Sequence, residues 1–315
     1  MSVDGCVAGG KVAVTGASGF IGRYLCEDLE AAGYRPLRLG RGAPQGAVER
    51  QTDYSCDSLA RALEGTEAVV HLAGRRMTRQ DDPDDITPFQ KPNVAVIGDL
   101  VAAARQARVR RIVLASTIAV YGRDQPNPCH EGTRVQPINA YATSKLMAEA
   151  HLGMLTRAGG PSSVALRLAS VYGHGEKDTP VMMRFVDQAL AGETIMVTGH
   201  SDTAIDQIYV RDATAAIIAA LRHPEVTGIC NIGGGEALPV RRIAETVNVI
   251  HGNMGNLIDK TDSTGRPDRC IMALDRAARD LGWRPAYDLE TGLQDMRKVI
   301  LACGAIIEED IACRR

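Results

Sequence analysis

The sequence lacks a long apolar run and a large net charge, and each absence excludes a class of protein. No run of about 18 or more apolar residues is present, so we expect no membrane-spanning helix. Residues 1–10 do not place a basic segment before an apolar one, which predicts a cytoplasmic protein without an export signal. The formal net charge of −2 favours neither nucleic acid nor an anionic membrane as a partner.

Closely spaced cysteines are also missing. The eight cysteines stand apart from one another, and none forms a C-x-x-C pair. Several lie in apolar stretches, as Cys230 does after Ile229 and Cys270 does before Ile271. This pattern predicts buried, reduced thiols, and it favours neither disulfides nor a metal site.

The composition and the order of elements indicate an α/β protein. Apolar residues make up 45% of the chain and charged residues 23%, which is ordinary for a soluble globular enzyme. Patterns typical of strands and helices alternate between residues 11 and 168. This alternation predicts a doubly wound parallel sheet of the Rossmann type.

The stretch that organises the first half of the chain is Val12-Ala-Val-Thr-Gly-Ala-Ser-Gly-Phe-Ile-Gly22, a strand pattern, three glycines and the start of a helix. The first glycine permits a sharp turn, the second lets a pyrophosphate approach the backbone, and the third allows close packing of the helix on the strand. Free N–H groups at the start of the helix then face the phosphates. The alternative is a tight turn that holds no ligand. The cofactor contacts predicted here are Gly16, Gly19, Phe20, Ile21 and Gly22.

The segments after this motif bear on which dinucleotide binds. Arg35 to Leu39 has the pattern of a strand, and the place after it, where NAD sites often carry an acid, holds Gly40 and Arg41. Arg41 can pair with a 2′-phosphate, so NADP stays open beside NAD; the alternative is a surface arginine. Asp53, at the expected end of a third strand, is a candidate for contact with the adenine.

A buried strand is expected over Ala68–Gly74, and it ends in small residues that leave room for a cofactor. We expect His71, within this strand, to be a core residue rather than a catalyst. The polar segment Arg75–Pro92 that follows predicts a mobile flap. The cofactor contacts predicted at the end of the strand are Leu72, Ala73 and Gly74.

The regular alternation weakens after Gly173. We therefore expect a dinucleotide-binding domain over residues 1–173 and a smaller substrate-binding lobe over residues 174–315. Segment 207–232 contains two further strand patterns and is expected to return to the first sheet. A substrate would lie in the cleft between the two parts.

The candidate catalytic residues lie in Tyr141-Ala-Thr-Ser-Lys145, within a helical pattern. A spacing of four residues places the tyrosine and the lysine on one helix face. A phenol has an unperturbed pKa of about 10, and a nearby ammonium favours the phenolate. Such a pair is usually only a solvated helix face. Here, however, the hydroxyls of Ser116 and Thr117 end the preceding strand, and the glycine turn precedes both.

Taken together, these motifs resemble the extended short-chain dehydrogenase/reductases, and within them the NAD-dependent epimerases and dehydratases that act on nucleotide sugars. The resemblance extends from Lys11 to about Val299. It is carried by the glycine turn, Leu72-Ala-Gly74, Ser116-Thr117-Ile-Ala-Val-Tyr-Gly122 and Tyr141-Ala-Thr-Ser-Lys145.

The resemblance implies a role for each catalytic candidate. Tyr141 would be the general base, Lys145 would hold the nicotinamide ribose and lower the pKa of Tyr141, and Thr117 would hydrogen-bond the reacting oxygen. The implied activity is that of a nucleotide-sugar epimerase, which oxidises C4 of the sugar with bound NAD and returns the hydride to the opposite face. The resemblance also implies a homodimer. The substrate contacts that it implies are Ser116, Ser170, Arg266 and Asp268.

The sequence departs from the family pattern at three places, and these departures limit which reactions of the family are expected. Ile118-Ala119 stand where the dehydratases carry an Asp-Glu pair, which counts against dehydration and against the decarboxylating relatives. Ser170 replaces the usual asparagine and Ile205 replaces the usual arginine, so one cationic phosphate contact is lost. An NAD(P)H-dependent ketoreductase acting on a 4-keto-deoxy sugar or a non-nucleotide carbonyl substrate therefore stays open as the alternative.

Overall fold

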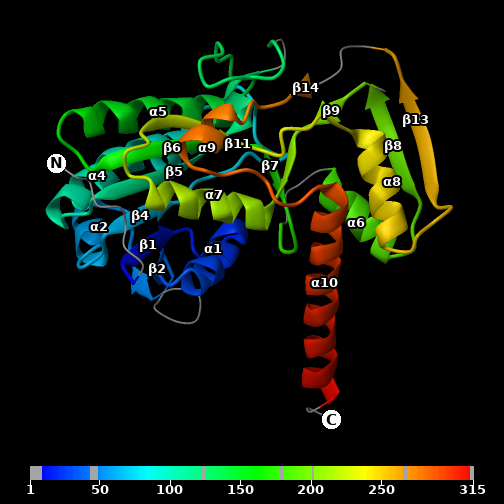
Figure 1. Cartoon of the computed structure of the whole chain (residues 1–315), viewed down its shortest axis with the longest axis horizontal. Coiled ribbons are helices and arrows are strands. Elements are labelled where there is room, and N and C mark those ends of the chain that lie inside the picture. The colour runs from blue at the N-terminus through cyan, green and yellow to red at the C-terminus, as the bar shows by residue number, and fades with distance from the viewer. Residues whose placement is uncertain are drawn as a thin grey trace.

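The computed structural model describes residues 9–42, 49–122, 125–176, 181–200, 202–264 and 269–312, and only the backbone of Arg269 and of residues 304–312. Its centre is a parallel sheet of seven strands in the order β11-β6-β5-β4-β1-β2-β3 (Figure 1). The predicted doubly wound α/β fold is therefore confirmed. The strands are β1 (Lys11–Thr15), β2 (Arg35–Gly40), β3 (Arg50–Gln51), β4 (Ala68–His71), β5 (Arg111–Thr117), β6 (Ser162–Leu168) and β11 (Gly228–Ile232).

Helices cover both faces of this sheet. On β1, Val12 and Val14 join one apolar cluster with Leu25 and Ile217, whereas Ala13 joins the cluster of the other face. Because successive strand residues point to opposite faces, burial on both sides requires the continuous apolar runs that the sequence shows. One face carries α1 (Phe20–Ala31) and α7 (Val210–Arg222); the other carries α2 (Cys56–Ala62), α4 (Val96–Gln106) and α5 (Ala140–Arg157).

A smaller lobe lies beside the sheet and has its own apolar core (Figure 1). In it, the parallel strands β8 and β13 pair with each other and were not predicted as strands. The long C-terminal helix α10 extends away from the rest of the chain (Figure 1). The elements are α6 (Met182–Leu190), β8 (Ile195–His200), α8 (Val240–Ile250), β13 (Leu257–Asp262) and α10 (Leu289–Ala312).

Short strands connect the sheet to this lobe. Of the segment expected to return to the sheet, β11 pairs with β6, but β10 pairs with β7 in a separate two-stranded ladder. The division of domains at residue 173 stays a prediction. The connecting elements are β7 (Ser170–Tyr172), β9 (Ala204–Ile205), β10 (Gln207–Tyr209), β12 (Leu238–Pro239), β14 (Arg269–Cys270) and α9 (Asp275–Asp280).

The segment expected to be a mobile flap is partly core. It contains α3 (Thr87–Phe89) and begins the π-helix η1 (Gln90–Ala95). Phe89 is completely buried, and its ring packs edge-to-face on Tyr141 with centroids 6.2 Å apart. The prediction that the whole segment lies outside the core is therefore wrong at Phe89, which anchors the helical end, and the mobility of the rest stays a prediction. Among the described residues, no helix is long and apolar enough to cross a membrane.

Candidate active site

The three glycines of the turn leave no room for a Cβ. Gly16 has a φ of +70°, and a Cβ there would lie 2.9 Å from the backbone nitrogen of Ala73. A Cβ on Gly22 would collide with the carbonyl oxygen of Gly16, and one on Gly19 would lie 3.1 Å from that same oxygen. No side chain caps the start of α1, so its first N–H groups are left for another acceptor. This cradle fits the pyrophosphate of a dinucleotide.

The end of β4 closes one side of this turn. The hydroxyl of Thr15 accepts a hydrogen bond from the backbone N–H of Ala73 at 3.2 Å and lies 2.9 Å from Nδ1 of His71. Burial, and then the charge of Lys145, lower the pKa of His71 to about 3, so this side chain is neutral. His71 is a core residue, as predicted. Just after the carboxyl end of β4, Leu72 and Ala73 are partly exposed and Gly74 is exposed.

The two residues predicted near the ribose and the adenine lie on the surface. Arg41 is exposed, and its carbonyl accepts a hydrogen bond from Gln51. The carboxylate of Asp53 accepts from the backbone N–H of Ser55 at 2.9 Å and from its hydroxyl at 2.7 Å, and these bonds lower the pKa of Asp53. Their contacts with a cofactor stay predictions. Sequence reasoning missed Tyr54, whose hydroxyl receives a hydrogen bond from the backbone of Gly16.

The start of α5 positions Tyr141, the predicted catalytic tyrosine. Asn139 caps the helix, and its Oδ1 accepts from the backbone N–H of Ala142 at 2.8 Å. Tyr141 therefore lies in the first turn, and Lys145 lies one turn later on the same face. Thr117 ends β5, and its hydroxyl lies near enough to the phenol of Tyr141 to lower the pKa of that phenol. The structure thus brings together the three predicted catalytic residues.

Opposing effects act on the phenol of Tyr141. Burial raises its pKa above the usual value, whereas the charge of Arg76 and the hydrogen bond from Thr117 lower it. Arg76 donates to both carboxylate oxygens of Glu176, at 2.9 and 2.8 Å, and the negative charge of Glu176 raises the pKa of Tyr141. Sequence reasoning missed Arg76 and Glu176, because they come from the loops after β4 and β7, far apart in the chain.

Lys145 is held at the junction of three elements. Its ammonium donates to the carbonyl oxygen of Ala115 at 2.9 Å, and a Cβ on Gly74 would lie only 3.6 Å from its Nζ. Burial lowers the pKa of Lys145 to about 8, and the nearby charge of Glu149 opposes this shift. An ammonium beside the glycine at the end of β4 is suited to contact the hydroxyls of a ribose.

The hydroxyl of Ser116 is turned away from Thr117. It is buried and donates to Oε1 of Glu149, 2.5 Å away. Glu149 also accepts from Arg167, at 3.0 and 2.7 Å, and the Arg167 guanidinium lies 4.7 Å from the ring centre of Tyr121. Ser116 therefore belongs to a buried polar network behind the site. Its predicted contact with substrate stays a prediction.

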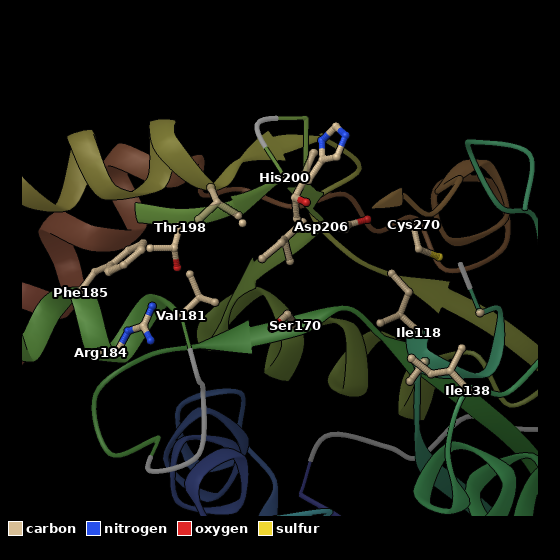
Figure 2. Close-up of a pocket in the computed structure, with 17 residues that line it drawn as sticks. Ile118, Ile138, Ser170, Val181, Arg184, Phe185, Thr198, His200, Asp206 and Cys270 are labelled. Atoms are coloured by element: carbon tan, nitrogen blue, oxygen red, sulfur yellow. The ribbon is translucent and has the colours of Figure 1, made fainter. Parts of the chain in front are cut away.

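A cavity of about 480 Å³ opens next to the end of β5, where Ile118 lines it (Figure 2). Ile118 and Ala119 form the part of its wall that is next to Thr117, and the predicted substrate residue Ser170 also lines it. The polar side chains at its wall include Arg184, His200 and Asp206. The other two predicted substrate residues, Arg266 and Asp268, lie outside the described residues.

Asp206, in the cavity wall, connects two other segments of the chain by hydrogen bonds. Its carboxylate accepts from the backbone N–H groups of Gly234, Gly235 and Met272, at 2.7, 3.3 and 3.0 Å. Burial raises its pKa to about 6, and these three hydrogen bonds oppose the rise. Ile205, next to it, presents an apolar side chain to the cavity where the family pattern has arginine.

Comparison with known proteins decides the family. Residues 12–233 match the sequence profile described as the NAD dependent epimerase/dehydratase family. The chain belongs to this family. NAD is accordingly its cofactor, and the glycine cradle agrees with this. A member of the family, the UDP-glucose 4-epimerase of Azospirillum brasilense, is 28% identical over 319 residues, which is 92% of this chain and 91% of that protein.

Solved structures of the family superpose over nearly the whole chain. The UDP-N-acetylglucosamine 4-epimerase of Bacillus cereus is 31% identical with a TM-score of 0.84, and the match covers 92% of this chain and 96% of that one. MoeE5 in complex with UDP-glucose and NAD is 26% identical with a TM-score of 0.78, and the match covers 92% of this chain and 100% of that one. The predicted family membership is confirmed.

Proposed function

We propose that the protein is a nucleotide-sugar 4-epimerase that retains NAD through its catalytic cycle. The observation that carries the proposal is the grouping of Thr117, Tyr141 and Lys145 at the end of β5 and the start of α5. Lys145 lies beside Gly74, and Ile118, the next residue after Thr117, lines the cavity. The class of substrate is supported by the relatives, which include UDP-glucose and UDP-N-acetylglucosamine 4-epimerases. Ile118 and Ala119, which carry no acid, argue against dehydration at this site.

The cofactor would lie across the carboxyl edge of the sheet. Gly16, Gly19 and Gly22, with the N–H groups of Phe20 and Ile21, would hold the pyrophosphate, because no side chain caps the start of α1. The edge formed by Leu72, Ala73 and Gly74 would contact the part near the nicotinamide. NAD, when bound, supplies a two-electron acceptor that takes a hydride from C4 of the sugar and returns it.

The protein's own groups would manage the proton. Tyr141, as phenolate, would remove the proton of the C4 hydroxyl and later give it back. Thr117 would hydrogen-bond the same oxygen, and the positive charge of Arg76 would favour the phenolate. Lys145 would orient the ribose hydroxyls through its ammonium. The cavity would hold the nucleotide portion, with Ser170, Arg184 and His200 as the polar contacts within reach.

Two measurements test this proposal. The purified protein should carry NAD, seen by absorbance and by mass spectrometry after denaturation, and it should interconvert UDP-glucose and UDP-galactose without added cofactor. Tyr141→Phe should lower kcat by at least about 10²-fold, because the base is lost, while the retained NAD stays the same. A protein that arrives empty and interconverts no UDP-sugar would contradict the proposal.

One observation favours a second function. Arg41, exposed just after β2 where a carboxylate would select NAD, offers a partner for the 2′-phosphate of NADP. An NADPH-dependent ketoreductase would use the same three catalytic residues. Oxidation of added NADPH by a 4-keto-6-deoxy sugar nucleotide would support this function. Arg41→Asp should then raise the KM for NADPH and leave that for NADH little changed.

The expected homodimer also belongs to the proposal. Met147 and Met154 on α5 are 44% and 55% exposed, and apolar side chains on a helix are typical of an interface. A dimer through α4 and α5 would cover them. Size-exclusion chromatography with light scattering should give twice the chain mass, and Met147→Glu with Met154→Glu should give a monomer. A monomeric wild-type protein would rule out this dimer.

A further inference from the structure

Two cysteines lie within reach of each other at the wall of the cavity. Sγ of Cys129 is 3.6 Å from Sγ of Cys270. Cys129 is completely buried, whereas Cys270 is partly exposed and lines the cavity (Figure 2). They are 141 residues apart in sequence, so only the fold brings them together. A reagent that enters the cavity can therefore reach one of the two sulfur atoms directly.

The backbone holds this pair in place. The N–H of Cys129 donates to the carbonyl oxygen of Ile271 at 2.6 Å, and the N–H of Ala273 donates to the carbonyl oxygen of Cys129 at 2.9 Å. The amide of Asn127 accepts from the N–H of Ile271 at 2.7 Å. The chain around Cys129 thus lies alongside the chain that follows Cys270. The approach of the sulfur atoms is a property of the paired backbones rather than of loose side chains.

The other buried cysteines differ chemically from this pair. Burial raises the pKa of the Cys26 thiol to about 11 and that of the Cys230 thiol to about 12, so neither forms a thiolate near neutral pH. At Cys129, by contrast, the hydrogen bond from Cys270 lowers the pKa of the thiol. Either sulfur of the pair can be the donor, so one shared proton can stabilise a thiolate on Cys129 or on Cys270, and a thiolate is the form needed for exchange.

We propose that Cys129 and Cys270 are a reversible oxidation site, at which a small disulfide such as oxidised glutathione entering through the cavity links them covalently. The Cys270 thiolate attacks one sulfur of oxidised glutathione, and one reduced glutathione leaves. The Cys129 thiolate then attacks Sγ of Cys270, and the second glutathione leaves. Two electrons and two protons pass from the two thiols to oxidised glutathione, which gives two molecules of reduced glutathione.

The position of Cys270 couples this chemistry to occupancy of the cavity. Cys270 pairs with Ile205 on the neighbouring strand, and both line the cavity. A nucleotide sugar in the cavity would cover Cys270; this part of the inference rests on the proposed function. With UDP-glucose at about ten times its Kd, oxidation should be about tenfold slower, because only the empty protein reacts.

The experiment treats the purified protein with oxidised glutathione, blocks the remaining thiols by alkylation, and maps the cysteines by mass spectrometry. The wild-type protein should lose two hydrogen atoms, yield a Cys129–Cys270 linked peptide, and recover both thiols on reduction. Cys129→Ser should retain one glutathione on Cys270, because the resolving thiol is gone. Cys270→Ser should take up none at Cys129. Cys26→Ser, which removes an equally buried cysteine outside the pair, should behave as the wild type.

Two results would overturn the inference, and both come from the wild-type protein, so they do not depend on how the variants fold. One is a stable glutathione adduct on Cys270 with no linked peptide. The other is the absence of reaction at both cysteines while the partly exposed Cys56 is modified. Oxidation at a rate unchanged by saturating UDP-glucose would overturn entry through the cavity. The epimerase assay decides the proposed function separately.

Discussion

One nitrogen of Arg76 donates hydrogen bonds to both carboxylate oxygens of Glu176, because Nη1 lies 2.9 Å from Oε1 and 2.8 Å from Oε2. The pair joins the loop after β4 to the loop after β7, and both charges act on Tyr141. The Glu176 side chain is only 4% exposed, whereas that of Arg76 is 51% exposed. The pKa of the Tyr141 phenol therefore depends partly on an ion pair that bridges two loops.

Opposite changes in pH dependence should follow from breaking this pair at either end. Arg76→Gln removes a charge that lowers the pKa of Tyr141, so the acidic limb of the kcat–pH profile should move to higher pH. Glu176→Gln removes a charge that raises this pKa, so the limb should move to lower pH. Arg110→Gln, which breaks a surface pair with Glu67, should leave the limb unchanged. Shifts of the same sign in both variants would contradict this account.

Lys145 is expected to lower the stability of the protein without its cofactor. Its pKa falls from 10.5 in the unfolded chain to about 8, so between these pH values the unfolded chain binds a proton that the folded chain has lost. The free energy of unfolding should therefore rise with pH across this window. Below it, the buried ammonium costs up to about 3 kcal/mol. Lys145→Met should raise Tm at pH 7, flatten this pH dependence and abolish turnover.

The control for this prediction is Lys91→Met, at an exposed position in η1. It should change neither Tm nor activity. The lost hydrogen bond to Ala115 offsets only about 1 kcal/mol of the gain expected for Lys145→Met. Thermal melts from pH 7 to pH 10.5, on protein stripped of NAD, provide the measurement. A variant that melts below the wild type at pH 7 would refute the prediction.

The buried ion pair of Glu149 and Arg167 should behave differently from pairs on the surface. Their side chains are 3% and 5% exposed. Glu149→Gln would leave the Arg167 charge buried without a counter-charge, which costs about 3–5 kcal/mol of unfolding free energy. Glu245→Gln breaks an exposed pair with Arg241 and should cost less than about 1 kcal/mol. Urea denaturation of both variants tests the contrast, and equal losses would contradict it.

The third glycine of the turn should tolerate no side chain. In Gly22→Ala the new Cβ would meet the carbonyl oxygen of Gly16 and lie 2.7 Å from Cα of Ala17, both of which are backbone atoms. The turn must shift, at a cost of about 1–3 kcal/mol, and the retained NAD should be lost. Gly132→Ala meets no atom within 4 Å and should retain NAD like the wild type. Full NAD content in Gly22→Ala would show that the cradle does not hold the cofactor.

Most of the central sheet could be predicted because its signal is local. The apolar runs of β1, β4, β5 and β6, and the helix periodicities between them, reflect burial on both faces. The pairing of β8 with β13 could not be predicted in this way. Every residue of β13 is at least partly exposed, so its sequence lacks the alternation of apolar and polar residues that indicates a strand with one buried face.

The candidate site shows the same limit. The glycine turn and the Tyr141–Lys145 spacing are local patterns, whereas Arg76 and Glu176 meet only in the folded chain. Thr117 is expected to be catalytic and Ser116 to contact the substrate, and both lie at the end of β5. Adjacent residues in a strand point to opposite faces, so one reaches Tyr141 and the other reaches Glu149. The strand pattern does not reveal which of the two faces the site, and the catalytic role of Thr117 is expected from the family resemblance.

The cavity and the proton-handling residues are built from separate parts of the molecule. Thr117, Tyr141 and Lys145 stand on β5 and α5, which belong to the seven-stranded sheet and its covering layer. Much of the cavity wall comes from β7, β8, β9 and α6, which are short elements with their own pairings. Exchange of side chains in these elements can therefore alter which ligand is accepted while the reaction chemistry is inherited unchanged. Single substitutions in the cavity wall can therefore change the ligand that binds without a change at Thr117, Tyr141 or Lys145.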